Sequence, residues 1–304
     1  MIKRTIEISS SGVFLSVELD QLVLRREGQE LQRIPIEDVG VLIVDTNGAT
    51  YTHAVITRLL GAGAVIVPCD GHHLPAGLLL PQDNCLQSQR LAAQVEASKP
   101  LRKQLWRQVV TAKIVNQADM LSHAPAAQSA LRGMARRVRS GDPDNLEAQA
   151  ARRYWPVMLG ASFRRDHDGP PPNNLLNYGY TVLRAAVARA VAGAGLHPSL
   201  GLHHHNRSNA FCLADDLVEP LRPLVDSRVR KLHQAGLSQI DKETKRQLLG
   251  VLTETVTLGD NAGPLMVALE RMAASLVRCY EGQSKRLDIP KPWNSADTAS
   301  CGCS

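Results

Sequence analysis

The chain has 304 residues, 44% of them hydrophobic and only 4% aromatic, which is enough apolar sequence for two domains with mainly aliphatic cores. Its net charge is +6, and its six scattered cysteines form no disulfide framework, so we expect a cytoplasmic protein. The start, MIKRTIEI, does not resemble a signal peptide, and no apolar run is long enough to span a membrane. We therefore expect no membrane partner.

Residues 1–80 are predicted to form a compact, mostly β domain with one helix. Alternating or β-branched runs separated by Ser, Gly, Asp and Asn indicate the strands. The expected strands are Ile2–Ile8, Val13–Glu18, Leu22–Arg26, Leu31–Pro35, Val39–Val44, Ala64–Val67 and His73–Leu80. Thr52–Leu60 has helical spacing and stops at Gly61. A polar linker follows at residues 81–85.

Residues 86–285 are predicted to form a larger all-α domain, which makes the fold class α+β. Leu101–Leu121 carries an apolar stripe, with Lys103, Arg107 and Lys113 away from it. The further helices are expected from Asn145 to near Pro156, from Asn173 or Asn174 to Gly195, and over Asn209–Val218, Ser227–Gln234, Lys242–Val256 and Pro264–Tyr280. Residues 286–304 form a polar tail, which we expect to be frayed.

Charge is distributed unevenly between these two parts. Residues 1–80 hold six Lys or Arg and nine Asp or Glu, a net of −3, so the remainder carries +9. The basic sequence is concentrated at Arg132–Arg139, which contains four arginines, and at Arg152–Arg153. A positive field confined to the helical part suggests a polyanion such as DNA as its partner, although on this observation alone ordinary solvating charge is the preferable explanation.

A histidine run and a group of carboxylates stand at suggestive spacing in the second half of the chain. His204, within His203–His205, lies twelve residues before Asp216 and fifteen before Glu219. A loop imidazole and one face of the following helix can therefore converge, with Glu147 as a distant third ligand. Imidazole and carboxylate oxygens suit manganese or magnesium, which can activate a phosphodiester as a Lewis acid.

Each of these residues also has an ordinary structural explanation. Asp144 and Glu147 have the spacing of a capping box, Glu219 can pair with Arg222 one turn on, and Asp215 or Asp216 can stabilise a helix N-terminus. The three histidines can be solvated loop residues. Taken singly, these explanations are preferable, whereas taken together the residues favour a metal site.

The motifs resemble one known family over nearly the whole chain, the CRISPR-associated integrase, which is the universal endonuclease subunit of spacer acquisition. The similar segments are TAKIVNQADML at Thr111–Leu121, LEAQAARRYWP at Leu146–Pro156, LNYGYTVLRAAVARAVAGAGLHPSLGLHH from Leu176, NAFCLADDLVEPLRPLVD up to Asp226, and more weakly ETKRQLLGVL at Glu243–Leu252. The chain most resembles the short forms from systems with a single large effector nuclease.

The resemblance implies a Mg²⁺ or Mn²⁺ site made by Glu147, His204 and Glu219, with Asp216 supporting it from behind. It implies an enzyme that joins the 3′-hydroxyl ends of a short double-stranded DNA fragment to a CRISPR repeat by transesterification. It also implies a homodimer formed through the β domain and a heterohexamer with a small ferredoxin-like adaptation subunit. A contact with the RNA-guided effector nuclease is a further partner that it allows.

Two other functions remain open from the sequence. The chain can be a DNA-binding scaffold with a degenerate metal site, although all three types of ligand are present. It can also be an unrelated hydrolase whose metal lies at His203–His205. That hydrolase would need no role for Glu147, so substitution of this residue separates it from the integrase.

Overall fold

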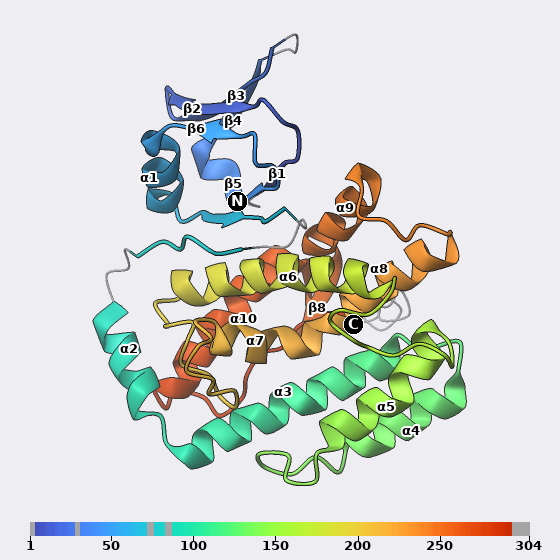
Figure 1. Cartoon of the computed structure of the whole chain (residues 1–304). Coiled ribbons are helices and arrows are strands. Elements are labelled where there is room, and N and C mark those ends of the chain that lie inside the picture. The colour runs from blue at the N-terminus through green and yellow to red at the C-terminus, as the bar shows by residue number, and fades with distance from the viewer. Residues whose placement is uncertain (1–3, 28–30, 72–75, 83–86, 294–304) are drawn as a thin grey trace, which may run out of the picture.

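The computed structural model describes residues 4–27, 31–71, 76–82 and 87–293. A strand-rich N-terminal part lies at one end of the molecule and a helical part forms the rest, which confirms the predicted α+β class (Figure 1). No helix within the described ranges is both long and apolar enough to cross a bilayer.

The N-terminal part contains two sheets and one helix. A parallel sheet has the order β1 (Arg4–Ile8), β5 (Val39–Val44) and β7 (Val65–Pro68). The other sheet has the order β4 (Gln32–Pro35), β3 (Gln21–Arg25), β2 (Phe14–Glu18) and β6 (Thr50–Tyr51). Helix α1 (His53–Gly61) connects them, with a short 3₁₀ turn at Ile36–Asp38 before β5. Every residue of β5 is buried, as expected for the central strand of a parallel sheet covered on both faces.

The two parts of the chain are joined by packing and by buried charge. Val41, Ile43 and Val65 belong to the core of the helical part, whereas Leu42 belongs to the core of the N-terminal part. Successive side chains point to opposite faces of a strand, so one face of the parallel sheet covers the helices. Lys245 also forms an ion pair with the fully buried side chain of Asp45.

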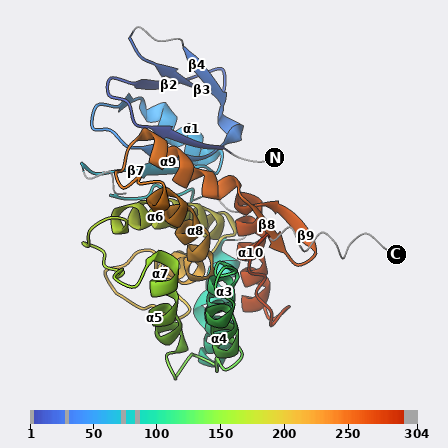
Figure 2. The same cartoon turned by 90° about the vertical axis from the view of Figure 1, so that its right-hand side faces the viewer.

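The helical part is built around α6 (Asn173–Gly193), most of whose residues are buried. Helices α3 (Lys99–Asp119), α4 (Pro125–Ala135) and α5 (Leu146–Leu159) pack together at the end of the molecule remote from the N-terminal sheets (Figure 2). The remaining elements are α2 (Gln87–Glu96), α7 (Cys212–Val218), a 3₁₀ turn at Glu219–Leu221, α8 (Arg222–Gln234), α9 (Lys242–Leu249), a 3₁₀ turn at Gly250–Thr253 and α10 (Leu265–Tyr280).

Two predicted helices are wrong in extent. The helix expected to end near Pro156 continues to Leu159, since Tyr154 and Met158 are buried on either side of the proline and their packing outweighs its cost. The helix expected to reach Val256 ends at Leu249. Its last predicted residues instead begin a hairpin of β8 (Thr255–Leu258) and β9 (Asn261–Pro264), favoured by β-branched residues before a Gly-Asp turn.

Two more predictions differ from the structure, one at the end of the N-terminal part and one in the C-terminal tail. Of the strand expected over His73–Leu80, residues 72–75 lie outside the described residues, and the rest forms a single bridge between Leu79 and Ile66. The tail expected to be frayed is packed as far as residue 293: Leu287 is buried, and β10 (Lys291–Pro292) pairs with β8. Buried apolar contact and strand pairing therefore order its first residues.

Candidate active site

Two of the predicted acidic ligands meet at one lysine. The Nζ atom of Lys113, in the middle of α3, lies 2.6 Å from Oε1 of Glu147 and 2.5 Å from Oε2 of Glu219. The side chain of Lys113 is 12% exposed and that of Glu219 is 10% exposed. The fold therefore brings together two carboxylates 72 positions apart in the sequence around a largely buried cation.

Glu147 is placed by the start of α5. The carboxylate of Asp142 accepts the backbone N–H groups of Leu146 at 2.9 Å and Glu147 at 3.0 Å. Asn145, in the left-handed region with φ of 50°, is the N-cap and accepts from Ala148. The capping box considered for Asp144 and Glu147 is wrong, because Asp144 pairs with Arg139 instead. The Glu147 side chain is thus available to the site.

Glu219 follows α7 directly, at the first residue of a 3₁₀ turn. Its Oε1 atom lies 3.0 Å from Nη2 of Arg222, so the pairing considered from the sequence is present. Burial raises the pKa of Glu219, but the charges of Arg222 and Lys113 outweigh burial and lower it from 4.5 to about 2. This carboxylate is therefore ionised at neutral pH.

His204 is held from behind by Asp216. The Nδ1 atom of His204 lies 2.5 Å from Oδ1 of Asp216, whose side chain is fully buried. This hydrogen bond raises the pKa of His204 against desolvation, and the charges of Asp216, Glu219 and Glu147 raise it further. Because Nδ1 contacts Asp216, Nε2 is the ring nitrogen available to a ligand. The neighbouring His203 instead stacks on Trp106, with ring centroids 4.4 Å apart.

A cleft of about 660 Å³ opens beside His204 and Glu219. Three arginines line it: Arg165, Arg184 and Arg222. Arg184 pairs with Asp215, and Arg222 lies over the ring of Tyr180 with its guanidinium carbon 4.5 Å from the ring centre. Planar guanidinium groups bind phosphate oxygens well, so the cleft suits an anionic substrate.

A buried carboxylate contacts Tyr180, one of the residues that line this cleft. Asp226 accepts hydrogen bonds from the hydroxyls of Tyr154, at 3.0 Å, and Tyr180. Burial raises the pKa of Asp226 from 3.8 to about 7, although both tyrosine hydrogen bonds oppose the shift. The network connects α5, α6 and α8, the helices that carry Glu147, Tyr180 and Arg222.

The structure thus pairs Glu147 with Glu219 through Lys113, and His204 with Asp216. Within the described ranges, no three His, Cys, Asp or Glu side chains already surround one point as metal ligands. Sequence reasoning did not assign Lys113 to the site and placed it only away from the apolar stripe of α3. Its position inside the motif at Thr111–Leu121 was the available signal.

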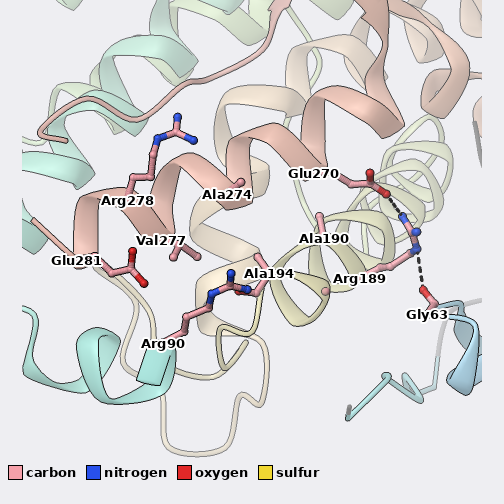
Figure 3. Close-up of a pocket in the computed structure, with 11 residues that line it drawn as sticks. Gly63, Arg90, Arg189, Ala190, Ala194, Glu270, Ala274, Val277, Arg278 and Glu281 are labelled. Atoms are coloured by element: carbon pink, nitrogen blue, oxygen red, sulfur yellow. Dashed lines mark hydrogen bonds and ion pairs between the residues drawn. The ribbon is translucent and has the colours of Figure 1, made fainter. Parts of the chain in front are cut away.

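A second cavity, of about 570 Å³, lies away from these residues between α6 and α10 (Figure 3). Arg189 crosses one side of it, donating to the carbonyl oxygen of Gly63 at 3.1 Å and to Glu270 at 2.9 Å. Arg90 donates to the carbonyl oxygen of Ala194 at 2.9 Å. These contacts connect α2, α6, α10 and the N-terminal part, which indicates a structural role.

Comparison with known proteins identifies the family of the chain. The model of the family "CRISPR associated protein Cas1" matches residues 6–257. A CRISPR-associated endonuclease Cas1 of Neisseria meningitidis is 36% identical over 294 residues, covering 95% of this chain and 96% of that protein.

Two solved structures share the fold at low sequence identity. A casposase bound to an integration product has a TM-score of 0.78 at 20% identity and covers 98% of each chain. A Cas6-RT-Cas1–Cas2 complex contains a chain with a TM-score of 0.75 at 19% identity, covering 96% of this chain and 36% of that one. The family match and the Neisseria relative establish that this chain belongs to the Cas1 family of CRISPR-associated proteins.

Proposed function

We propose that this chain is the metal-dependent integrase and endonuclease of CRISPR spacer acquisition. The observation that carries the proposal is the meeting of Glu147 and Glu219 at one cationic nitrogen, with His204 beside an arginine-lined cleft. The name of the Neisseria relative, an endonuclease, and the integration product held by the casposase support this class of chemistry.

The residues present fit a divalent cation. Both carboxylates already bind a common cation, and Asp216 leaves Nε2 of His204 available, so Glu147, His204 and Glu219 would hold Mg²⁺ or Mn²⁺. A bound ion would supply Lewis acidity at a phosphate oxygen. The low pKa of Glu219 means that this ligand needs no deprotonation at neutral pH.

The reaction needs no covalent intermediate on the protein. A 3′-hydroxyl of the incoming fragment attacks a phosphorus atom of the repeat, a new P–O bond forms, and the bond to the old 3′-oxygen breaks. The attacking hydroxyl releases its proton and the displaced 3′-oxygen takes one up, so the step neither gains nor loses a proton. Arg165, Arg184 and Arg222 would orient the phosphate and stabilise its developing negative charge.

The DNA is proposed to lie on the helical part. Within its basic clusters, Arg132 and Arg139 are exposed but pair with Asp119 and Asp144. In the described part of the chain, Arg136, Arg137 and the pair Arg152–Arg153 are exposed without such an ion pair. These exposed arginines are the best-placed contacts for the phosphates of double-stranded DNA.

The N-terminal β domain, residues 1–80, is proposed to form the homodimer, because it carries a net charge of −3 and exposes the aromatic rings of Phe14 and Tyr51. A heterohexamer with a small ferredoxin-like adaptation subunit is the proposed working assembly. The fold shared with a chain of a Cas6-RT-Cas1–Cas2 complex supports such a partner. The effector nuclease remains a further proposed contact.

An integration assay tests the proposal. The full-length chain with its adaptation subunit is given a fragment with free 3′-hydroxyl ends and a repeat-containing plasmid. Alanine at Glu147, His204 or Glu219 should abolish EDTA-sensitive joining, while His203→Ala, matched in residue type and adjacent in sequence, should retain it. Melting curves check that each variant is folded.

Each alternative function has its own outcome in this assay. Full joining by Glu219→Ala would overturn the proposed site. EDTA-sensitive cleavage without joining, lost in His203→Ala or His205→Ala and retained in Glu147→Ala, would favour the hydrolase centred on the histidine run. DNA binding without EDTA-sensitive joining in the wild type would favour the scaffold.

A further inference from the structure

We propose that Lys113 is a built-in counter-ion that occupies the Glu147–Glu219 site without metal, and that a divalent cation must displace its ammonium group to bind. The inference rests on the proposed function, because that function makes these carboxylates metal ligands. In this proposal Lys113, on α3, controls the affinity of the site for metal.

The geometry makes Lys113 a competitor for the site. Its Nζ atom contacts Oε1 of Glu147 and Oε2 of Glu219, so one nitrogen uses an oxygen of each proposed ligand. Arg222 contacts the other oxygen, Oε1, of Glu219, which therefore has both oxygens engaged by cations. While Arg222 keeps Oε1 of Glu219, the other oxygen of this carboxylate is the one that Lys113 holds, so a metal ion that binds Glu219 there meets the ammonium group.

The burial of the site gives a cationic side chain a clear role there. Two ionised carboxylates brought together away from water repel one another, and leaving a buried charge unpaired is strongly unfavourable. Lys113, with 12% of its side chain exposed, neutralises that repulsion. The lysine therefore holds the two acids together before metal arrives.

An ammonium group and a divalent cation cannot share this position. Like charges about 4 Å apart repel by several kcal/mol at the effective dielectric constant of a partly buried site. A neighbouring cavity of about 200 Å³, lined by Lys113, Gln117, Ala151 and Trp155 among others, gives the flexible lysine side chain room to move. Displacement is thus possible without a change in the helices.

Calorimetric titration of the full-length protein with Mn²⁺ tests the inference. Lys113→Met removes the charge and keeps the length of the side chain, and it should bind Mn²⁺ at least about tenfold more tightly than the wild type. Lys113→Gln, which can still donate a hydrogen bond, should also bind more tightly. Lys103→Met, an exposed position on the same helix, is the matched control and should show wild-type affinity.

Melting curves with and without Mn²⁺ provide a second readout. Without metal, Lys113→Met should melt below the wild type, because the two acids lose their cation, and Mn²⁺ should raise its melting temperature by more. If folded Lys113→Met and Lys113→Gln bind Mn²⁺ with wild-type or weaker affinity, Lys113 is not a competitor. Glu219→Gln distinguishes failure of the Lys113 hypothesis from failure of the metal site itself. If this variant binds Mn²⁺ as tightly as the wild type does, or if the wild type binds no Mn²⁺, the proposed metal site is wrong as well.

Discussion

The carboxylate of Asp216 holds the imidazole of His204 through Nδ1 at 2.5 Å, and it also fixes the loop that carries this histidine. The backbone N–H groups of Leu202, at 2.6 Å, and His203, at 2.9 Å, donate to Oδ2 of the same side chain. Loop position and ring orientation therefore depend on one fully buried carboxylate.

Asp216→Asn should weaken metal binding without removing a ligand. An amide has one acceptor oxygen instead of two, so the loop and the His204 ring lose part of their support. Substitutions of such supporting groups typically reduce metal affinity or activity by about 10- to 100-fold. We expect that loss in Mn²⁺ titration and in DNA joining. Asp215→Asn, which removes the charge next to it in the sequence, is the control for the Mn²⁺ titration, because Asp215 pairs with Arg184 and not with His204. Unchanged Mn²⁺ affinity in Asp216→Asn would contradict the role of Asp216.

Asp226 should make the protein less stable as pH rises through the weakly acidic range. Its pKa is about 7 in the folded state and about 3.8 when exposed, so between these values the folded state holds a proton that the unfolded state has lost. The free energy of unfolding must therefore fall between about pH 4 and 7, by up to a few kcal/mol.

Asp226→Asn removes this titration and should flatten the fall, as urea unfolding at pH 4, 5.5, 7 and 8 would show. His204, whose pKa is raised, contributes stability that is lost above its unfolded value of 6.5, but it does so in both proteins. If the stability of Asp226→Asn decreases between pH 4 and 7 as steeply as that of the wild type, the pKa of Asp226 is not raised as described.

The sequence predicted the elements with strong local patterns and missed what tertiary packing decides. Alternating apolar residues located β1 to β5, and the spacing of His204, Asp216 and Glu219 selected residues that do lie near each other. Pro156 was wrongly expected to end a helix, because the burial of its neighbours cannot be known from propensity.

Lys113 shows why the site was only partly predictable. On helical spacing it lies off the apolar stripe of α3 and looks like a solvated lysine, yet it is largely buried because α5 and the turn at Glu219 pack over that side of the helix. Which polar face another element covers depends on contacts between residues distant in sequence. Only the assembled fold shows those contacts.

The exposed arginines of the helical part should account for much of the salt dependence of DNA binding. Each phosphate contact contributes about 0.9 to the slope of log K against log salt concentration for duplex DNA. Arg136→Gln combined with Arg137→Gln should therefore lower the slope by up to about 2, as fluorescence anisotropy would measure. The matched double variant of Arg132 and Arg139, which pair with acids, should have a smaller effect. Equal effects of the two double variants on the salt slope would contradict the proposal that Arg136 and Arg137 contact DNA phosphates more than Arg132 and Arg139 do.

The exposed rings of β2 and β6 should support self-association. Phe14 is 38% and Tyr51 44% exposed, and β6 is the edge strand of its sheet. Phe14→Glu with Tyr51→Glu should place charges in the proposed dimer contact and shift the protein toward monomer in light scattering. Leu19→Glu, at a position 94% exposed in the turn after β2, is the control. A double variant that dimerises with undiminished affinity would move the contact elsewhere.

The position of Mn²⁺ in a crystal of the full-length protein tests the central claim most directly. Anomalous diffraction from crystals grown with Mn²⁺ should show one peak within ligand distance of Glu147, Glu219 and Nε2 of His204, with the Lys113 ammonium moved away from both carboxylates. A peak at His203 or His205 remote from Glu147, or a Glu147–Lys113–Glu219 arrangement unchanged at saturating Mn²⁺, would contradict it.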